Sequence, residues 1–172
     1  ENINRSTDIL ALLMMQSGLL LVENSESGAM FSKTLDKQNV GEVALKYYTD
    51  FASPKSRAYT WSEQMDYSID AFRTGKTAMM INYSHHINTL RLQAPRFNFD
   101  VASVPQLDQS NNINYANYWA PTVAKSSKFP VEAWEFIVYL TSKDGATSYI
   151  NASSRPPARR DLIEATKEDL NV

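Results

Sequence analysis

The sequence predicts an α/β fold. Residues 70–75 have the composition of a helix end, and the run Thr77 to Asn82 follows at once with four consecutive apolar residues. An unbroken apolar run of this length is typical of a strand that is covered on both faces. A helix that leads directly into such a strand indicates mixed layers of helices and strands, and 172 residues are enough for a sizeable core.

The first third of the chain predicts two helices. Residues 6–17 carry apolar side chains at helical spacing, and Gly18 is placed to end that helix. Residues 19–22 are typical of a short strand. A second helix is predicted over residues 40–51, where apolar and aromatic side chains again recur at helical spacing.

A capping box predicts the start of the next helix. Thr60 and Glu63 stand three residues apart, a spacing at which each side chain can satisfy a backbone N–H of the other residue. Gly75 closes this helix. We expect Gly75 in the left-handed conformation, because the chain must stop the helix there and turn directly into the strand at residues 77–82.

The second half of the chain adds further strands and helices around a polar loop at residues 106–114. Strands are predicted over residues 97–104 and 118–124, and helices over residues 84–93, 130–142, 144–151 and 160–169. The helix that starts at Pro130 is expected to bury an apolar face made of Val131, Trp134, Ile137, Val138 and Leu140.

The composition excludes several classes of protein. With 43% hydrophobic and 21% charged residues and a net charge of −2, the chain has no excess positive charge to attract nucleic acid or anionic lipid. It contains no cysteine, which removes disulfides, zinc–thiolate sites and thiol nucleophiles. The longest apolar stretch, residues 9–15, is too short to span a bilayer.

No export signal opens the sequence, and both ends are abrupt. We therefore interpret the sequence as an excised segment of a longer protein. Such a segment would leave apolar strand edges and helix faces uncovered, which predicts that it self-associates.

Three segments in a fixed order carry a family resemblance. Residues 71–81 read AFRTGKTAMMI, residues 119–128 read WAPTVAKSSK and are followed by AWEFI at 133–137, and residues 155–162 read RPPARRDL. These segments resemble the AFxxGKxAMxI, KxSK, AWxFL and PPxRxDxL patterns of family 1 extracellular solute-binding proteins, which serve ABC importers of the sugar-binding type. The resemblance covers residues 70–170 and is looser over residues 1–60.

The resemblance implies a periplasmic-binding-protein-like type II fold, in which two α/β lobes flank a ligand cleft. This chain would supply one lobe plus part of the other. Residues 1–115 would belong to the C-terminal lobe, and residues 116–172 would contribute the hinge strand and part of the N-terminal lobe. The resemblance also implies a small-molecule solute, such as a sugar or oligosaccharide, and ABC permease membrane subunits as partners. The location would be periplasmic or extracellular, with or without a lipid anchor on the full-length protein.

Five residues are candidates for ligand binding. Sugars expose flat C–H faces and many hydroxyls, so their sites need aromatic platforms beside polar side chains. The resemblance implies that two strands end at the cleft. Tyr83 and Ser84 are candidates at the end of one strand, and Asn117 and Trp119 are candidates at the other. The sequence departs from the family at both places, where relatives carry a Gly and a Trp or a Gly pair. Trp61, at a predicted helix start, is the fifth candidate, with a hydrophobic staple beside the cap as an equal alternative.

Two other clusters are assigned to structure. Adjacent side chains on a helix point about 100° apart, so His85 and His86 suit a capping or surface role better than a metal site. The arginines between Arg155 and Arg160 could clamp an anion, although a solvated turn is the more frequent use of such a cluster.

Enzyme signatures are missing from the sequence. It contains no nucleophile elbow, no phosphate loop, no His-Glu-x-x-His and no distinctive carboxylate pair. We therefore predict a binding protein, not an enzyme, without a cofactor or metal. Two alternatives stay open: a carbohydrate-active hydrolase, which would need two opposed carboxylates, and a peptide- or protein-interaction domain.

Overall fold

The computed structural model describes residues 2–22, 28–35, 37–153 and 155–166 of the chain. The chain divides into two compact units, each of which is described by itself. The first unit consists of Glu1–Asn82, Leu90–Phe99 and Ser103–Ala116, and the second of Tyr83–Thr89, Asp100–Ala102 and Asn117–Val172.

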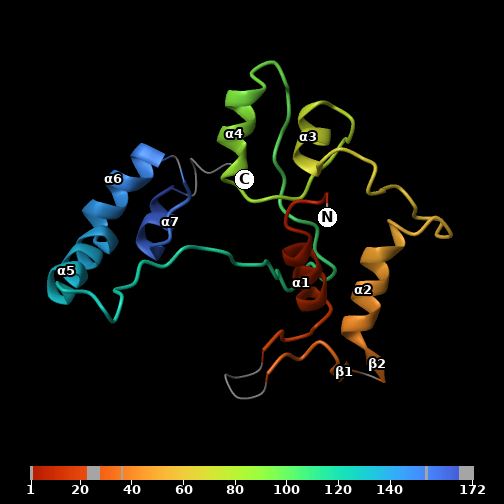
Figure 1. Cartoon of the computed structure of the whole chain (residues 1–172), viewed down its shortest axis with the longest axis horizontal. Helices are drawn as coiled ribbons and strands as arrows, with labels where there is room; N and C mark the ends of the chain where they lie inside the picture. The colour runs from red at the N-terminus through yellow and green to blue at the C-terminus, as the bar shows by residue number, and fades with distance from the viewer. Residues whose placement is uncertain (1, 23–27, 36, 154, 167–172) are drawn as a thin grey trace. The chain divides into compact units, whose positions relative to one another are not determined.

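The first unit is built around two helices. Helix α1 spans Ser6–Gln16 and helix α2 spans Val40–Asp50, so both predicted helices are confirmed (Figure 1). Between them lie two short strands, β1 at Thr34–Leu35 and β2 at Gln38–Asn39, which pair antiparallel. The residues that pack between α1 and α2 form the core of this unit, with Leu19 fully buried among Met14, Val40 and Ala44.

Helix α1 ends as its sequence predicts. Gly18 has a φ of +89°, and its N–H donates to Met15 O at 2.9 Å. The N–H of Leu19 reaches back to Met14 O at 3.1 Å, which completes a Schellman motif. The side chain of Leu19 is buried in the core. The strand predicted over residues 19–22 does not form, and this stretch makes only an isolated bridge between Val22 and Ala29.

Helix α3 is shorter than predicted, because the capping box at Thr60 does not form. The helix spans Ser68–Arg73 and follows Tyr67, which provides no side-chain cap. The backbone N–H of Thr60 donates to Phe51 O at 2.9 Å and so belongs to the turn that follows α2. The C-terminal end of α3 is as predicted: Gly75 has a φ of +74°.

The predicted strands at residues 77–82, 97–104 and 118–124 do not form. A strand needs a partner for its backbone groups, and in the described part of the chain pairing is confined to β1 with β2 and the bridge at Val22. Met79, expected to be covered on both faces, is 87% exposed. The described structure is thus mainly helical, with a small sheet, where the sequence predicted an alternation of helices and strands.

Helix α4 at His86–Gln93 confirms the helix predicted after Ser84, and it contributes residues to both units. Its buried residue, Leu90, lies in the part that belongs to the first unit.

The second unit contains three further helices that the sequence predicts. Helix α5 spans Pro130–Thr141 with Pro130 in its first turn, α6 spans Lys143–Ser153, and α7 spans Arg160–Thr166. Arg159 joins two of them, since its Nη1 donates to Thr141 O at 2.7 Å and its Nε to Asp161 Oδ1 at 3.0 Å. The hydrogen bond from Arg159 to Asp161 lowers the pKa of the Asp161 carboxyl below its ordinary value.

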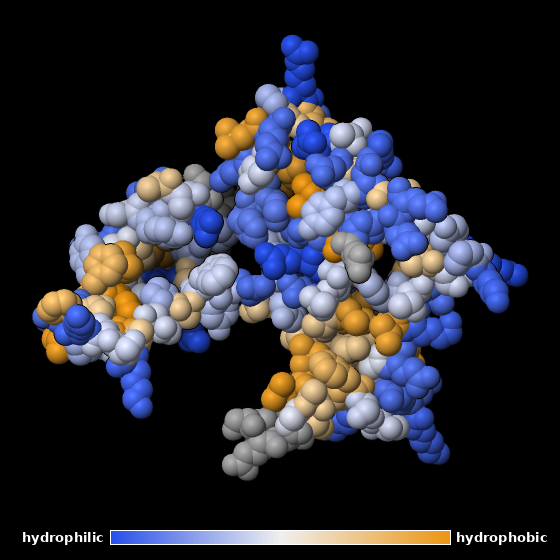
Figure 2. All heavy atoms as spheres, in the orientation of Figure 1, coloured by the Kyte–Doolittle hydropathy of each residue, from blue (hydrophilic) through white to orange (hydrophobic). Residues whose placement is uncertain are grey.

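The apolar face predicted for α5 is only half covered. Ile137 and Leu140 are partly buried, and α5 contacts α6. On the rest of this face, Val131, Trp134 and Val138 are exposed, so the assignment of Trp134 to the core is wrong: 53% of its surface is open. Figure 2 shows hydrophobic side chains at the surface over this helix.

A membrane-crossing helix, which must be long and apolar throughout, does not occur in the part of the chain that the structure describes.

Candidate functional site

Tyr83 lies at the entrance to α4, within a group of three rings. Its ring stacks on that of His85, with centroids 5.9 Å apart and planes 18° from parallel. The ring of His85 lies 4.4 Å from that of His86. The carbonyl of Tyr83 accepts the N–H of His86 at 3.0 Å, which fixes the turn that leads into the helix. Tyr83 is partly buried, so part of the phenol remains open to a ligand.

Ser84 is exposed in the same turn. Its carbonyl accepts the N–H of Ile87 at 3.0 Å, and the helix itself begins two residues later, at His86. A hydroxyl at this position can donate one hydrogen bond and accept two, which is the chemistry that a sugar hydroxyl needs from a partner.

Asn117 and Trp119 lie in a segment without helix or strand, and both are exposed. Trp119 is 95% exposed, and its neighbour Tyr118 is 79% exposed. Removing a large aromatic side chain from water lowers the free energy, so an exposed indole offers a surface on which a ligand or another chain can pack. Trp119 is therefore more accessible than the other two aromatic candidates, Tyr83 and Trp61, which are partly buried.

Trp61 belongs to the first unit, whereas the other four candidates belong to the second. It is partly buried, and its indole Nε1 donates to Asn2 Oδ1 at 2.9 Å. The staple interpretation of Trp61 is wrong, because a staple must flank the start of a helix and α3 begins only at Ser68. Trp61 instead lies in an irregular loop that Asn2 holds by several hydrogen bonds.

Asn2 is a neighbour of the candidate residue Trp61 that the sequence did not reveal. Its Nδ2 donates to Ser62 O and to Met65 O, both at 2.9 Å, while its Oδ1 accepts from Trp61. These partners lie about 60 residues further along the chain. Asn is a common residue in turns, so its type alone carries no signal of a long-range contact.

The remaining clusters show structural contacts. No group of three or more His, Cys, Asp or Glu side chains that could hold a metal ion occurs among the described residues. In the arginine cluster at residues 155–160, Arg159 donates hydrogen bonds to Thr141 O and to Asp161. This arginine therefore links α5 to α7. Glu63 and Asp66 are both exposed, and Lys76 forms an ion pair with Asp66.

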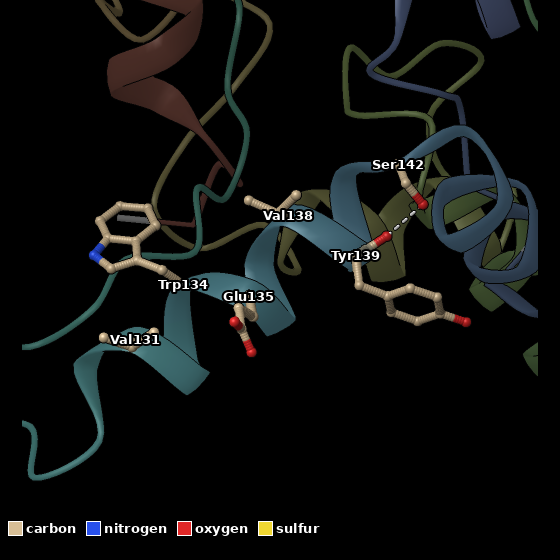
Figure 3. A pocket seen from close by; sticks show the side chains of 6 residues that line it. All are labelled: Val131, Trp134, Glu135, Val138, Tyr139 and Ser142. Atoms are coloured by element: carbon tan, nitrogen blue, oxygen red, sulfur yellow. Dashed lines mark hydrogen bonds between the residues drawn. The ribbon is translucent and has the colours of Figure 1, made fainter.

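The structure also contains an open hollow that the sequence did not predict. It measures about 540 Å³ and is lined by residues of a single stretch: Val131, Trp134, Glu135, Val138, Tyr139 and Ser142. Figure 3 shows Val131, Trp134 and Val138 following one another along α5, and the Ser142 hydroxyl bonded to Tyr139 O. One helix face cannot enclose a small solute, since ligand sites of that kind cover most of the ligand surface.

Comparison with known proteins assigns the chain to a family. The family model described as bacterial extracellular solute-binding protein matches residues 3–170. No curated protein and no solved structure matches the chain. Members of this family bind small solutes outside the cytoplasm, work with transporter components and are generally non-catalytic. Since the match spans nearly all of the sequence, this chain belongs to the family of bacterial extracellular solute-binding proteins.

Proposed function

We propose that this protein captures a small sugar or oligosaccharide and delivers it to an ABC importer, without chemical change to the solute. The observation that carries the proposal is the family match over residues 3–170. The side chains of Ser84, Asn117 and Trp119, which are exposed, and of Tyr83, which is partly buried, support a sugar as the solute, because they combine ring faces with hydrogen-bonding groups.

The mechanism that we propose is capture between two lobes of a type II binding-protein fold. Residues 1–115 contribute to the C-terminal lobe, and residues 116–172 contribute the hinge strand and part of the N-terminal lobe. A solute that contacts both lobes binds the closed state more tightly than the open one, so it shifts the population toward closure. The affinity difference between the two states sets how far the equilibrium moves.

Each candidate residue has a role in this proposal. Tyr83 and Trp119 are stacking platforms for the C–H faces of sugar rings, while Ser84 and Asn117 hydrogen-bond the hydroxyls at the ring edge. Trp61 is a third platform, contributed, like Tyr83, by residues 1–115. The closed protein, held in the periplasm or outside the cell, then docks on membrane permease subunits and releases the solute there.

Thermal-shift screening tests the proposal. The chain is heated with glucose, galactose, xylose, maltose and cellobiose in turn, each at high concentration. In parallel, the folded chain is incubated with maltose and cellobiose, which contain a glycosidic bond, and both sugars are analysed for cleavage. A sugar at 100 times its dissociation constant stabilises the folded state by about 2.7 kcal/mol, which raises the melting temperature by several degrees. A shift without cleavage supports capture. A shift with cleavage products favours the hydrolase alternative, and no shift with any sugar contradicts sugar capture.

A further inference from the structure

The loop that carries Trp61 has little structure of its own. Between the end of α2 at Asp50 and the start of α3 at Ser68, the chain contains turns but no helix and no strand. Its backbone hydrogen bonds are mostly local, such as that from Met65 N–H to Ser62 O at 3.1 Å. A loop of this kind holds one conformation only if contacts from elsewhere in the chain fix it.

Asn2 supplies such contacts at four points. Both N–H groups of its side-chain amide are used, on the carbonyls of Ser62 and Met65. Its Oδ1 accepts from the Trp61 indole, and its backbone carbonyl accepts the N–H of Ser68 at 2.8 Å. Asn2 therefore connects the Trp61 side chain, the backbone that follows Trp61 and the start of α3.

Asn4 holds the far end of the same loop. Its backbone N–H donates to Ser68 Oγ at 2.9 Å, and its Nδ2 donates to the Tyr67 hydroxyl. Neither of these bonds reaches Trp61. Asn2 and Asn4 thus anchor neighbouring parts of one segment, but only Asn2 touches the indole.

We propose that Asn2 is a positioning residue for Trp61, which it fixes so that the indole presents a ring face, and not an N–H, to the C–H face of a sugar. An indole has a single hydrogen-bond donor, and Asn2 Oδ1 occupies it. Trp61 is partly exposed, and a ligand that reaches its ring meets a π face and no free hydrogen-bond donor. The inference rests on the proposed function, and it assigns Trp61 to recognition of an apolar sugar face and not of a hydroxyl.

Three variants separate positioning from general stability. Asn2→Ala removes the acceptor and both side-chain donors. Asn2→Asp keeps an oxygen to accept from the Trp61 indole but removes both donors to the loop carbonyls. Asn4→Ala is the matched control, because it removes only the bond to Tyr67 and leaves the backbone bond to Ser68 intact.

The first measurement is the affinity of each variant for the panel sugar that stabilises the wild-type chain most. The second is the protection of the Trp61 indole N–H against hydrogen exchange, followed by NMR. Both are made below the melting temperature of the least stable variant. Asn2→Ala should lose indole protection and bind roughly tenfold more weakly, since an unfixed ring must be ordered on binding. Asn2→Asp should recover part of the indole protection, because an oxygen still faces the indole N–H, but it should bind more weakly than the wild type, because a carboxylate repels the carbonyl oxygens of Ser62 and Met65. Asn4→Ala should retain both the protection and the affinity. If Asn2→Ala does not fold, Asn2→Asp must still bind more weakly than Asn4→Ala.

The possible failures are distinct. If no panel sugar stabilises the wild-type chain, the proposed sugar capture fails. If a sugar binds and Asn2→Ala binds it as well as the wild type, this inference alone is overturned. Equal weakening by Asn2→Ala and Asn4→Ala would also overturn it, because the effect would then follow general loop stability. Finally, Trp61→Ala must weaken binding at least as much as Asn2→Ala.

Discussion

Gly75 shows how local chemistry fixes a turn at the scale of one residue. Its φ of +74° lies in the left-handed region, and Lys76 N–H donates to Ala71 O at 2.8 Å behind it. A Cβ added at Gly75 would meet no atom within 4 Å, so the cost of a side chain here is backbone strain and not a clash. The conformation was predictable because a helix stop needs a residue that tolerates positive φ.

Gly75→Val should therefore lower the free energy of unfolding by about 1–2 kcal/mol, the usual cost of a left-handed L-residue. Gly75→Asn should cost less, because Asn tolerates this conformation. Chemical denaturation of the three proteins checks the order. Equal stability of the Val variant and the wild type would show that this turn relaxes freely.

Tyr83 supports a second prediction at this scale. Tyr83→Ala removes the ring that stacks on His85, and it should weaken binding of the panel sugar by about 1–2 kcal/mol, roughly a five- to thirtyfold loss. Tyr83→Phe keeps the ring and should retain most of the affinity. Isothermal titration calorimetry measures both. A Phe variant as weak as the Ala variant would instead assign the binding energy to the hydroxyl.

Single residues were predictable only where their partners are close in sequence. Gly18 and Gly75 end helices by bonds that span five residues or fewer, so sequence spacing reveals them. The contact between Asn2 and Trp61 spans 59 residues, and no local pattern marks it. For the same reason, the sequence proposed Trp61 as a site residue without showing what holds it.

At the scale of elements, helices were predictable and strands were not. Helices α1, α2, α5 and α6 satisfy their own backbone groups, so caps, Pro130 and periodicity are enough to place them. The apolar run at residues 77–82 has the composition of a buried strand, but a strand also requires a neighbour, which local sequence cannot supply. Residues 77–82 thus carry a strand-like sequence without a strand partner in the described structure.

The junction between α5 and α6 depends on a close approach. A Cβ on Gly145 would lie 2.2 Å from Tyr139 O, closer than any real contact. Gly145→Ala must therefore displace the end of α5, and we expect a loss of about 1–3 kcal/mol in the free energy of unfolding. Ser148→Ala, an exposed change in the same helix, is the control and should be neutral. A Gly145→Ala protein as stable as this control would contradict the packing described for the junction.

At the scale of the whole molecule, the main feature is the exposed apolar surface on helix α5. Val131, Trp134 and Val138 are exposed together on α5, and apolar helix faces of this kind normally meet a partner. We therefore expect the isolated chain to self-associate as concentration rises. Trp134→Gln should reduce the mean mass measured by light scattering and leave the melting temperature nearly unchanged. A monodisperse wild-type monomer at high concentration contradicts the expectation.

The most direct test of solute capture compares Trp119→Ala with Tyr118→Ala. Both aromatics are exposed, so either change should alter the free energy of unfolding by no more than about 0.5 kcal/mol. The proposed site includes Trp119 and not Tyr118, so only the change at Trp119 should affect the binding of a solute. Titration calorimetry with the panel sugar should show Trp119→Ala weaker by about 1–2 kcal/mol and Tyr118→Ala unchanged. Wild-type affinity in Trp119→Ala would contradict the proposed site, and no binding by the wild-type chain would contradict sugar capture itself.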